Sequence, residues 1–299
     1  MNASIALLNA VLPSSVHVHT TVAAGHPSAA ILGSDRVGSG TLVDSAGLIV
    51  TAHYIVLGAD RIAVTLLDGT TVAGEVAARD FACGLALVRT ETVPLPSAPL
   101  GSSLALNRGD EVFLVAAAGA AARRANNGVV MSLDSFDAPW EYSLDRAIIT
   151  TAVNPGLNGG ALFDRLGRMV GVSAFDFNEV GRATLAIPLE CFADHRDELL
   201  RHGRRVSRPA RAWIGLYCYA MRDRLIVAGV LPDTPAEQAG LQPGDILLTI
   251  DGEQITARRT LYRKLWAHRP GDTIECTVFR TDRICALTIQ TVDVEKFFG

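Results

Sequence analysis

The sequence predicts a mainly β protein that ends in a small α+β domain. Between residues 38 and 188, short β-rich runs alternate with turns. Residues 188–203 change to helical spacing, and residues 212–299 mix strands with short helices. Many short strands separated by turns favour antiparallel barrels or a sandwich over βαβ units.

The first two thirds of the chain supply the strands. Residues 1–20, "MNASIALLNAVLPSSVHVHT", predict a short amphipathic helix that leads into a strand. Asp68-Gly69 and Arg165-Leu166-Gly167 stand where hairpin turns belong. The β-rich runs cover residues 40–52, 61–80, 84–90, 110–119, 127–133, 146–153, 167–175 and 183–190.

The helical pattern at 188–203 marks the end of the β-rich region. Its apolar side is formed by Cys191, Phe192, His195, Leu199 and Leu200, and Gly203 is expected to end it. The Arg- and Pro-rich stretch that follows reads as a solvated linker. We therefore predict a first domain at 1–204, a linker at 205–211 and a second domain at 212–299.

The second domain has its own order of elements. Strands are expected at 213–220 and 224–231, and a short helix in "TPAEQAG". A strand then reaches a turn at Asp251-Gly252, an amphipathic helix covers 257–268, and two strands close the domain.

Composition narrows the classes of function. The net charge is −4 and no long block of one sign occurs, which argues against a nucleic-acid or membrane-surface partner. No apolar run is long enough for a membrane span. The N-terminus lacks the basic flank of a signal peptide, so the expected location is cytoplasmic, or extracytoplasmic if a targeting segment was removed.

Histidines are the only candidates for a metal site. His17 and His19 fall on one face of a strand, as the start of a two-ligand site requires, but a solvent-facing pair is the simpler interpretation. His195 and His202 have no matching Cys or acid cluster. We predict no metal and no cofactor.

Two stretches carry a family resemblance. "GSGTLVDSAGLIVTAHYIVLGADRIAVTLLDGT" and "ITTAVNPGLNGGALFDRLGRMVGV" make residues 38–188 similar to the trypsin-like domain of the HtrA serine proteases. "TPAEQAGLQPGDILLTIDG" makes residues 212–295 similar to the PDZ domain of that family. The resemblance implies a double six-stranded antiparallel β-barrel, a His/Asp/Ser triad and a PDZ domain.

The resemblance also shows where this chain departs from the family. The histidine position falls on Tyr54, with His53 one place early. The aspartate position falls on Gly84, and the serine position on Asn158, whose carboxamide has no proton to surrender near neutral pH. We expect these three residues to face one another between the barrels, with no hydroxyl or thiol in contact with His53.

The turn around Asn158 keeps the glycines of the family. The resemblance implies that backbone N–H groups in an oxyanion-type turn formed by Gly156, Asn158 and Gly159 hold an anion or a peptide carbonyl. A second interpretation is that these glycines, together with Gly160, only make a turn that the barrel requires.

The PDZ-like region carries the predicted peptide site. The resemblance implies that the loop Trp213, Ile214, Gly215 and Leu216 captures a peptide carboxylate through backbone N–H groups, while the peptide adds a strand to a sheet edge. Leu261 and Leu265, one helical turn apart, are candidates for the lining of the peptide groove. Ordinary core packing is the alternative for these two leucines.

These observations predict a catalytically inactive HtrA-like protein, hence no enzyme, that binds polypeptide segments or C-termini as a scaffold, a chaperone-like protein or a regulator. Expected partners are polypeptides, a second copy of the chain or an active protease relative. One alternative is an endopeptidase with a rearranged site that uses His53 and a serine from elsewhere. Another is a structural or metal-binding module.

Overall fold

The computed structural model describes residues 3–91, 95–177 and 182–299. The chain forms two compact units. One, the barrel unit, holds the chain up to Asp134 and the segment Asp145–Val206. The other, the C-terminal unit, holds Ser135–Leu144 and Ser207–Gly299. A ten-residue segment from the middle of the chain therefore belongs to the C-terminal unit.

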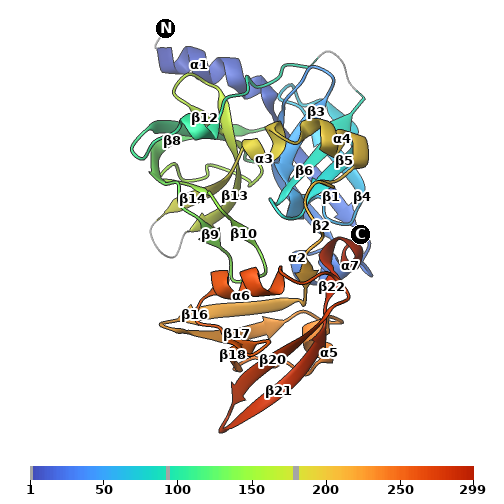
Figure 1. Ribbon diagram of the computed structural model, residues 1–299. Coiled ribbons are helices and arrows are strands. Elements are labelled where there is room, and N and C mark those ends of the chain that lie inside the picture. Colours follow the sequence, from blue (N-terminus) through green and yellow to red (C-terminus); the bar gives the residue numbers. More distant parts are fainter. Residues whose placement is uncertain (1–2, 92–94, 178–181) are drawn as a thin grey trace. The chain divides into compact units, whose positions relative to one another are not determined.

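The barrel unit begins with a closed six-stranded antiparallel barrel, blue to cyan in Figure 1. Its strand order is β1-β2-β3-β6-β5-β4. Alternating β-branched residues place Val16, Val18, Ile62 and Val64 inside it, where they form one apolar core. The strands are β1 (Ser15–Val22), β2 (Asp35–Leu42), β3 (Leu48–Ala52), β4 (Ala59–Thr65), β5 (Thr71–Asp80) and β6 (Leu85–Thr90).

A second closed six-stranded barrel follows, in green and yellow, with the order β11-β14-β13-β12-β7-β8. Its core contains Leu114, Ile148, Leu162 and Val170. The predicted mainly β class and the double barrel are thereby confirmed. The strands are β7 (Glu111–Ala117), β8 (Arg123–Ser132), β11 (Ile148–Thr150), β12 (Ala161–Asp164), β13 (Met169–Phe177) and β14 (Ala183–Pro188).

Short helices connect and flank the barrels. The expected N-terminal helix is α1 (Ala3–Val11), which passes through η1 (Leu12–Ser14) into β1. The remaining helices of the unit are α2 (Pro27–Leu32), η2 (His53–Ile55), η3 (Ser103–Ala105), α3 (Glu190–Ala193) and α4 (Arg196–His202).

The single helix expected at 188–203 is wrong in one respect, because the structure divides it into α3 and α4. His195 leaves helical geometry at φ −123° and ψ 8°. Asp197 and Glu198 then occupy the first turn of α4, where acidic side chains stabilise a new helix N-terminus. The predicted end at Gly203 is confirmed, with φ +70°.

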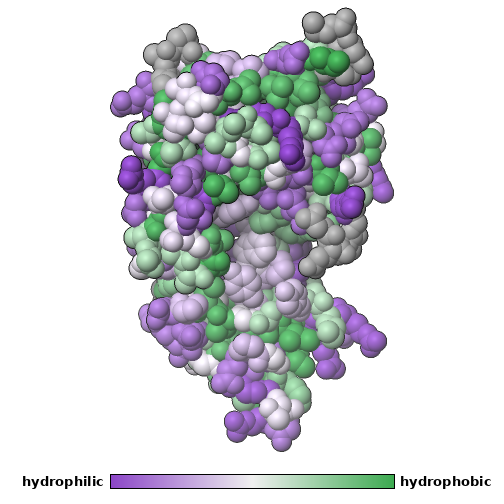
Figure 2. All heavy atoms as spheres, turned by 180° about the vertical axis from the view of Figure 1, so that it is seen from behind, coloured by the Kyte–Doolittle hydropathy of each residue, from purple (hydrophilic) through white to green (hydrophobic). Residues whose placement is uncertain are grey.

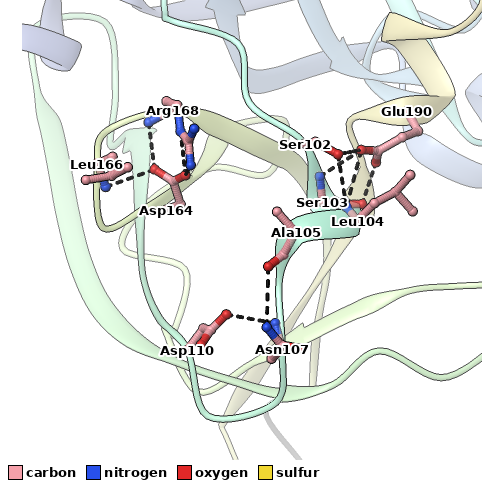
Figure 3. A network of polar contacts seen from close by, with 10 residues as sticks. All are labelled: Ser102, Ser103, Leu104, Ala105, Asn107, Asp110, Asp164, Leu166, Arg168 and Glu190. Atoms are coloured by element: carbon pink, nitrogen blue, oxygen red, sulfur yellow. Dashed lines mark hydrogen bonds and ion pairs between the residues drawn. The ribbon is translucent and has the colours of Figure 1, made fainter.

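Two carboxylates hold connections of the barrel unit in place (Figure 3). Asp164 accepts hydrogen bonds from the N–H groups of Leu166 and Arg168, both at 2.9 Å, and so closes the predicted turn at 165–167. Glu190, at the start of α3, accepts from the Ser102 hydroxyl at 2.7 Å and from the Ser103 N–H at 2.8 Å, which fixes η3.

The C-terminal unit is built on one antiparallel sheet with the order β16-β17-β18-β20-β21, with β19 paired to β18. Its apolar core is separate from those of the barrels and includes Leu225, Leu247, Ile274 and Val278. The sheet strands are β16 (Leu216–Met221), β17 (Arg224–Val230), β18 (Ile246–Ile250), β19 (Glu253–Gln254), β20 (Thr273–Arg280) and β21 (Arg283–Gln290).

The other elements of this unit surround the sheet. Two small ladders accompany it, β15 with β22 and β9 with β10. β9 and β10 form a hairpin that in Figure 1 reaches α6. The bounds are β9 (Phe136–Asp137), β10 (Ser143–Leu144), β15 (Ala212–Trp213), β22 (Val292–Asp293), α5 (Pro235–Gln238), α6 (Arg258–Leu265) and α7 (Val294–Phe297).

Within the described residues, none of the helices combines the length and the apolar character that crossing a membrane requires. On the face shown in Figure 2, hydrophobic residues form separate areas between hydrophilic ones.

Candidate functional site

The turn that carries Asn158 is packed directly against neighbouring backbone. A Cβ atom on Gly159 would lie 2.1 Å from the Ser39 carbonyl oxygen, and Gly159 has φ +93°. A Cβ atom on Gly156 would lie 2.3 Å from the Ala117 carbonyl oxygen. Glycine is therefore required here by close approach of other strands as well as by backbone conformation.

Two N–H groups of this turn already have partners inside the chain. The Gly156 N–H donates to the side-chain oxygen of Asn154 at 3.2 Å, and the Gly159 N–H donates to the Ser173 carbonyl at 2.8 Å. An anion bound at the turn would have to replace the Asn154 side chain at Gly156.

The Asn158 side chain belongs to a polar cluster with an acid at its centre. Its Nδ2 donates to Oδ2 of Asp176 at 3.1 Å, and its Oδ1 accepts from Nδ2 of Asn154 at 3.0 Å. The Thr184 hydroxyl donates to the other oxygen of Asp176 at 3.2 Å. Asp176 lies on β13 and Thr184 on β14, so the second barrel supplies the carboxylate that the sequence does not place beside Asn158.

Tyr54 reaches the same cluster from the first barrel. Its hydroxyl donates to the Ala174 carbonyl at 3.4 Å and is hydrogen-bonded to the Asn158 side chain. Burial, together with the negative charge of Asp176, raises the pKa of Tyr54 to about 12. The structure thus brings Tyr54 and Asn158 together, with a neutral phenol between the barrels.

His53 and Gly84 meet through the backbone instead. The His53 N–H donates to the Gly84 carbonyl at 2.9 Å, while the imidazole packs on the Phe81 ring with centroids 4.1 Å apart. Burial, and then the charges of Arg79 and Arg36, lower the pKa of His53 to about 3. Its Nε2 atom has no hydrogen-bond partner among the described residues. A neutral imidazole of such low pKa is a weak general base.

The two histidines of β1 have different surroundings. His17 is buried, and burial lowers its pKa. His19 places Nε2 2.6 Å from the Asp35 carboxylate. In the part of the chain that the structure describes, no three His, Cys, Asp or Glu side chains are grouped as metal ligands.

In the C-terminal unit, the predicted carboxylate loop (residues 213–216) surrounds a carboxylate from the chain itself. Oε1 of Glu141 accepts the Gly215 N–H at 2.8 Å and the Leu216 N–H at 2.9 Å. Oε2 accepts the Ile214 N–H at 3.1 Å. Gly215 has φ +85°, a conformation that glycine adopts without strain and that turns consecutive N–H groups toward one point.

The residues before Glu141 run along the free edge of β16. Trp140 and Tyr217 form an antiparallel β-bridge, and the Cys218 N–H donates to the Pro139 carbonyl at 2.8 Å. From α6, the Tyr262 hydroxyl lies 2.6 Å from the Ala138 carbonyl oxygen and 2.7 Å from that of Trp140. The segment 138–141 therefore lies between β16 and α6.

Burial dominates the electrostatics at Glu141. It raises the pKa of this carboxyl to about 7, although the three N–H groups act in the opposite direction. Two neighbouring groups stay neutral near pH 7, because burial also raises the pKa of the Cys218 thiol to about 11 and the pKa of Tyr262 well above its ordinary value.

The structure gives other roles to some of the predicted peptide-site residues. Leu261 and Leu265 are fully buried in the core of the unit. The Trp213 ring packs on Phe297 and Phe298. Three of the four loop residues present N–H groups to the bound carboxylate.

Sequence reasoning missed Glu141, Tyr262 and Asp176. Tyr262 follows Leu261 on the predicted amphipathic helix, and this position could have identified it as a candidate residue of the peptide site. Nothing in the local pattern singles out the other two, because their partners are distant in the sequence.

Two family models match the chain, one in each unit. Residues 38–172 match a family model described as a trypsin-like peptidase domain, and residues 212–291 match one described as a PDZ domain.

Relatives cover most of this chain. A putative serine protease HhoA of Synechocystis sp. is 30% identical over 284 residues, which span 87% of this chain and 71% of that protein. A probable periplasmic serine endoprotease DegP-like of Halomonas elongata is 26% identical over 272 residues, or 86% of this chain and 56% of its own length. This chain thus spans little more than half of that relative.

Solved structures share the fold. The HtrA-type protease AlgW with tripeptide has a TM-score of 0.60 and 24% identity, with 97% of both chains covered.

These relatives contradict the prediction that the chain is not an enzyme, because they are named serine proteases or endoproteases. That prediction considered only the identities of Tyr54, Gly84 and Asn158. It did not foresee that the fold places Asp176 against Asn158.

Proposed function

This chain belongs to the HtrA-like family of trypsin-like serine proteases with a PDZ domain, and we propose that its C-terminal unit binds the C-termini of polypeptides. The observation that carries the proposal is the convergence of the Ile214, Gly215 and Leu216 N–H groups on one carboxylate. A loop that holds the Glu141 carboxylate has the donors needed for a terminal carboxylate.

The edge of β16 supports the same proposal. It accepts an extended segment in antiparallel pairing, as the Trp140–Tyr217 bridge illustrates. Main-chain pairing is tolerant of side-chain identity, so it suits a protein with many polypeptide clients. Such binding fits a scaffold, chaperone-like or regulatory role.

The test is capture of peptides by the immobilised full chain. A degenerate decapeptide library with free C-termini is compared with the same library amidated at the C-terminus, and retained peptides are quantified by mass spectrometry. We expect enrichment of the free-carboxylate library, because an amide cannot supply the charged acceptor. Equal retention of the two libraries contradicts the proposal.

Endopeptidase activity is a second candidate function, and the names of the relatives support it. Hydrolysis at this site would require water as the nucleophile, since Asn158 has no hydroxyl to activate. Asp176, 3.1 Å from Asn158, is the carboxylate placed to accept a proton from such a water.

Digestion of fluorescent casein by the purified chain tests this second candidate. We expect Asp176→Asn to lower the rate by about a hundredfold or more, because it removes the general base. Asp134→Asn, a substitution of an exposed acid in the same unit, should keep the full rate. Absence of digestion by the unmodified chain, or full activity of Asp176→Asn, refutes this role.

A further inference from the structure

The hairpin loop (residues 138–142) occupies the site that the proposed function assigns to an external peptide. It connects β9 and β10, which pair through Asp137 with Ser143 and Phe136 with Leu144. In the sequence, the hairpin is inserted between β8 and β11 of the second barrel, yet its residues belong to the C-terminal unit.

The direction of the loop matches that of a bound C-terminal peptide. Pro139 is bonded to Cys218 and Trp140 is paired with Tyr217, and Glu141 then meets Leu216. The segment thus runs antiparallel to β16 and ends with a carboxylate at the carboxylate loop. Strand addition and carboxylate capture, the two elements of PDZ-type recognition, are both satisfied from within the chain.

Contacts outside the carboxylate loop hold the hairpin as well. Nε of Arg259 on α6 lies 3.1 Å from the Asp137 carboxylate. The Tyr262 hydroxyl contacts two hairpin-loop carbonyls, and Ala138 and Tyr142 are buried. The occupant of the site is therefore a folded hairpin. It is held by several contacts in addition to those of the Glu141 carboxylate.

We propose that the segment 138–141 is an internal ligand of the C-terminal unit, so that a polypeptide C-terminus binds only when the hairpin loop leaves the carboxylate loop and the edge of β16. The two occupants need the same three N–H groups, and one carboxylate fills them. Binding of an external peptide is thereby gated by release of the hairpin.

Gating lowers the apparent affinity for any external peptide. When only a fraction of the molecules has the site open, the apparent dissociation constant rises by the inverse of that fraction. Substitutions that weaken the docked hairpin without altering the carboxylate loop therefore tighten peptide binding. This inference rests on the proposed peptide binding, and the following experiment separates the two.

The probe is a fluorescein-labelled peptide with the sequence of residues 135–140, SFDAPW, and a free C-terminal carboxylate. It retains the residues that pair with β16 and ends in a carboxylate. Its affinity for the full chain is measured by fluorescence anisotropy at about pH 6, and the C-terminally amidated peptide is the control. The variants are Glu141→Ala, which removes the internal carboxylate, and Glu275→Ala, which removes an exposed carboxylate of β20 in the same unit.

We expect Glu141→Ala to bind the free-carboxylate peptide about tenfold or more tighter than the unmodified chain, because the three N–H groups no longer have an internal acceptor that competes for them. Glu275→Ala should bind like the unmodified chain. If the unmodified chain and Glu141→Ala bind the peptide equally tightly, the internal-ligand proposal is wrong and peptide binding stands. If Glu141→Ala and the unmodified chain both fail to bind, peptide binding itself is refuted.

A second variant tests the gating proposal with a substitution that does not change Glu141. Asp137→Asn weakens the ion pair with Arg259 and leaves Glu141 and the carboxylate loop unchanged. We expect a rise in affinity of about two- to fivefold, as befits a partly exposed ion pair. If Glu141→Ala folds poorly, an unchanged affinity for Asp137→Asn overturns the gating proposal by itself.

Discussion

At the scale of single residues, the turn around Asn158 shows how backbone packing limits side chains. Gly159 approaches the Ser39 carbonyl so closely that a Cβ atom would lie at 2.1 Å, with the Thr51 hydroxyl at 2.6 Å. These contacts join β2 and β3 to the turn, so the glycine serves the packing of the barrel unit whatever the residue at position 158 does. The interpretation that the barrel requires these glycines has direct geometric support.

Gly159→Ala is expected to destabilise the barrel unit by about 2–4 kcal/mol, through the clash and the positive φ together. Gly69→Ala is the matched control, because Gly69 also has positive φ, at +88°, but no atom lies within 4 Å of the position that its Cβ would take. It should lose only about 1 kcal/mol. Urea unfolding followed by far-ultraviolet circular dichroism measures both, and equal losses would show that close packing is irrelevant at Gly159.

At the scale of elements, one ion pair joins two neighbouring strands of the C-terminal unit. Asp245, directly before β18, is 1% exposed, and both of its oxygens lie 2.7 Å from the Arg280 guanidinium at the end of β20. Burial alone would raise the pKa of Asp245, but the hydrogen bonds from Arg280 and from the Gln242 N–H lower it below its ordinary value of 3.8. This arrangement stabilises the unit above that pH and is lost as the pH falls below it.

We predict that Asp245→Ala lowers the free energy of unfolding of the C-terminal unit by about 3 kcal/mol near pH 7, because Arg280 loses its partner. All three tryptophans of the chain, Trp140, Trp213 and Trp266, lie in this unit, so their fluorescence reports its unfolding. Asp282→Ala, in the exposed β20–β21 turn, should change the free energy of unfolding by no more than about 0.5 kcal/mol. Equal unfolding midpoints for the two variants would show that the ion pair does not stabilise the C-terminal unit.

The elements themselves were largely predictable. Alternating apolar residues, Gly-containing turns and the Gly203 stop identified the barrel strands and the end of the 188–203 helical region. The break between α3 and α4 was missed, because an uninterrupted apolar spacing hides a local change at His195. The β9–β10 hairpin was also missed, since its strands have two residues each and carry no periodicity.

At the scale of the whole molecule, docking of the hairpin loop is expected to depend on the protonation of Glu141. The pKa of Glu141 is raised from 4.5 to about 7 in the docked hairpin, and release into water would return it toward its ordinary value. The docked state therefore binds more protons than the released state between these two values. Docking is strongest below about pH 4.5 and weakens as the pH rises through 7.

Peptide affinity of the unmodified chain should accordingly increase more than about tenfold from pH 5 to pH 8. Glu141→Gln offers a neutral acceptor oxygen to the same N–H groups, so its affinity should change little over this range. Two other titratable groups near the segment, Cys218 on β16 and Tyr262 on α6, stay neutral over this range, because burial raises the pKa of each. Anisotropy titrations of both proteins across the pH range measure these affinities. Parallel profiles for the two proteins would show that a group other than Glu141 causes the pH dependence.

The sequence by itself determined the two classes of domain, and it predicted the carboxylate loop at 213–216. These features depend on residue type, local spacing and turn chemistry, which are readable along the chain. Only the tertiary structure decided that Asp176 lies against Asn158 and that Glu141, 73 to 75 residues before its partners, fills the carboxylate loop. The physical reason is that strand pairing in the barrels and the sheet brings together residues that are far apart in the sequence. A local sequence pattern does not specify which distant side chain will lie at a given site.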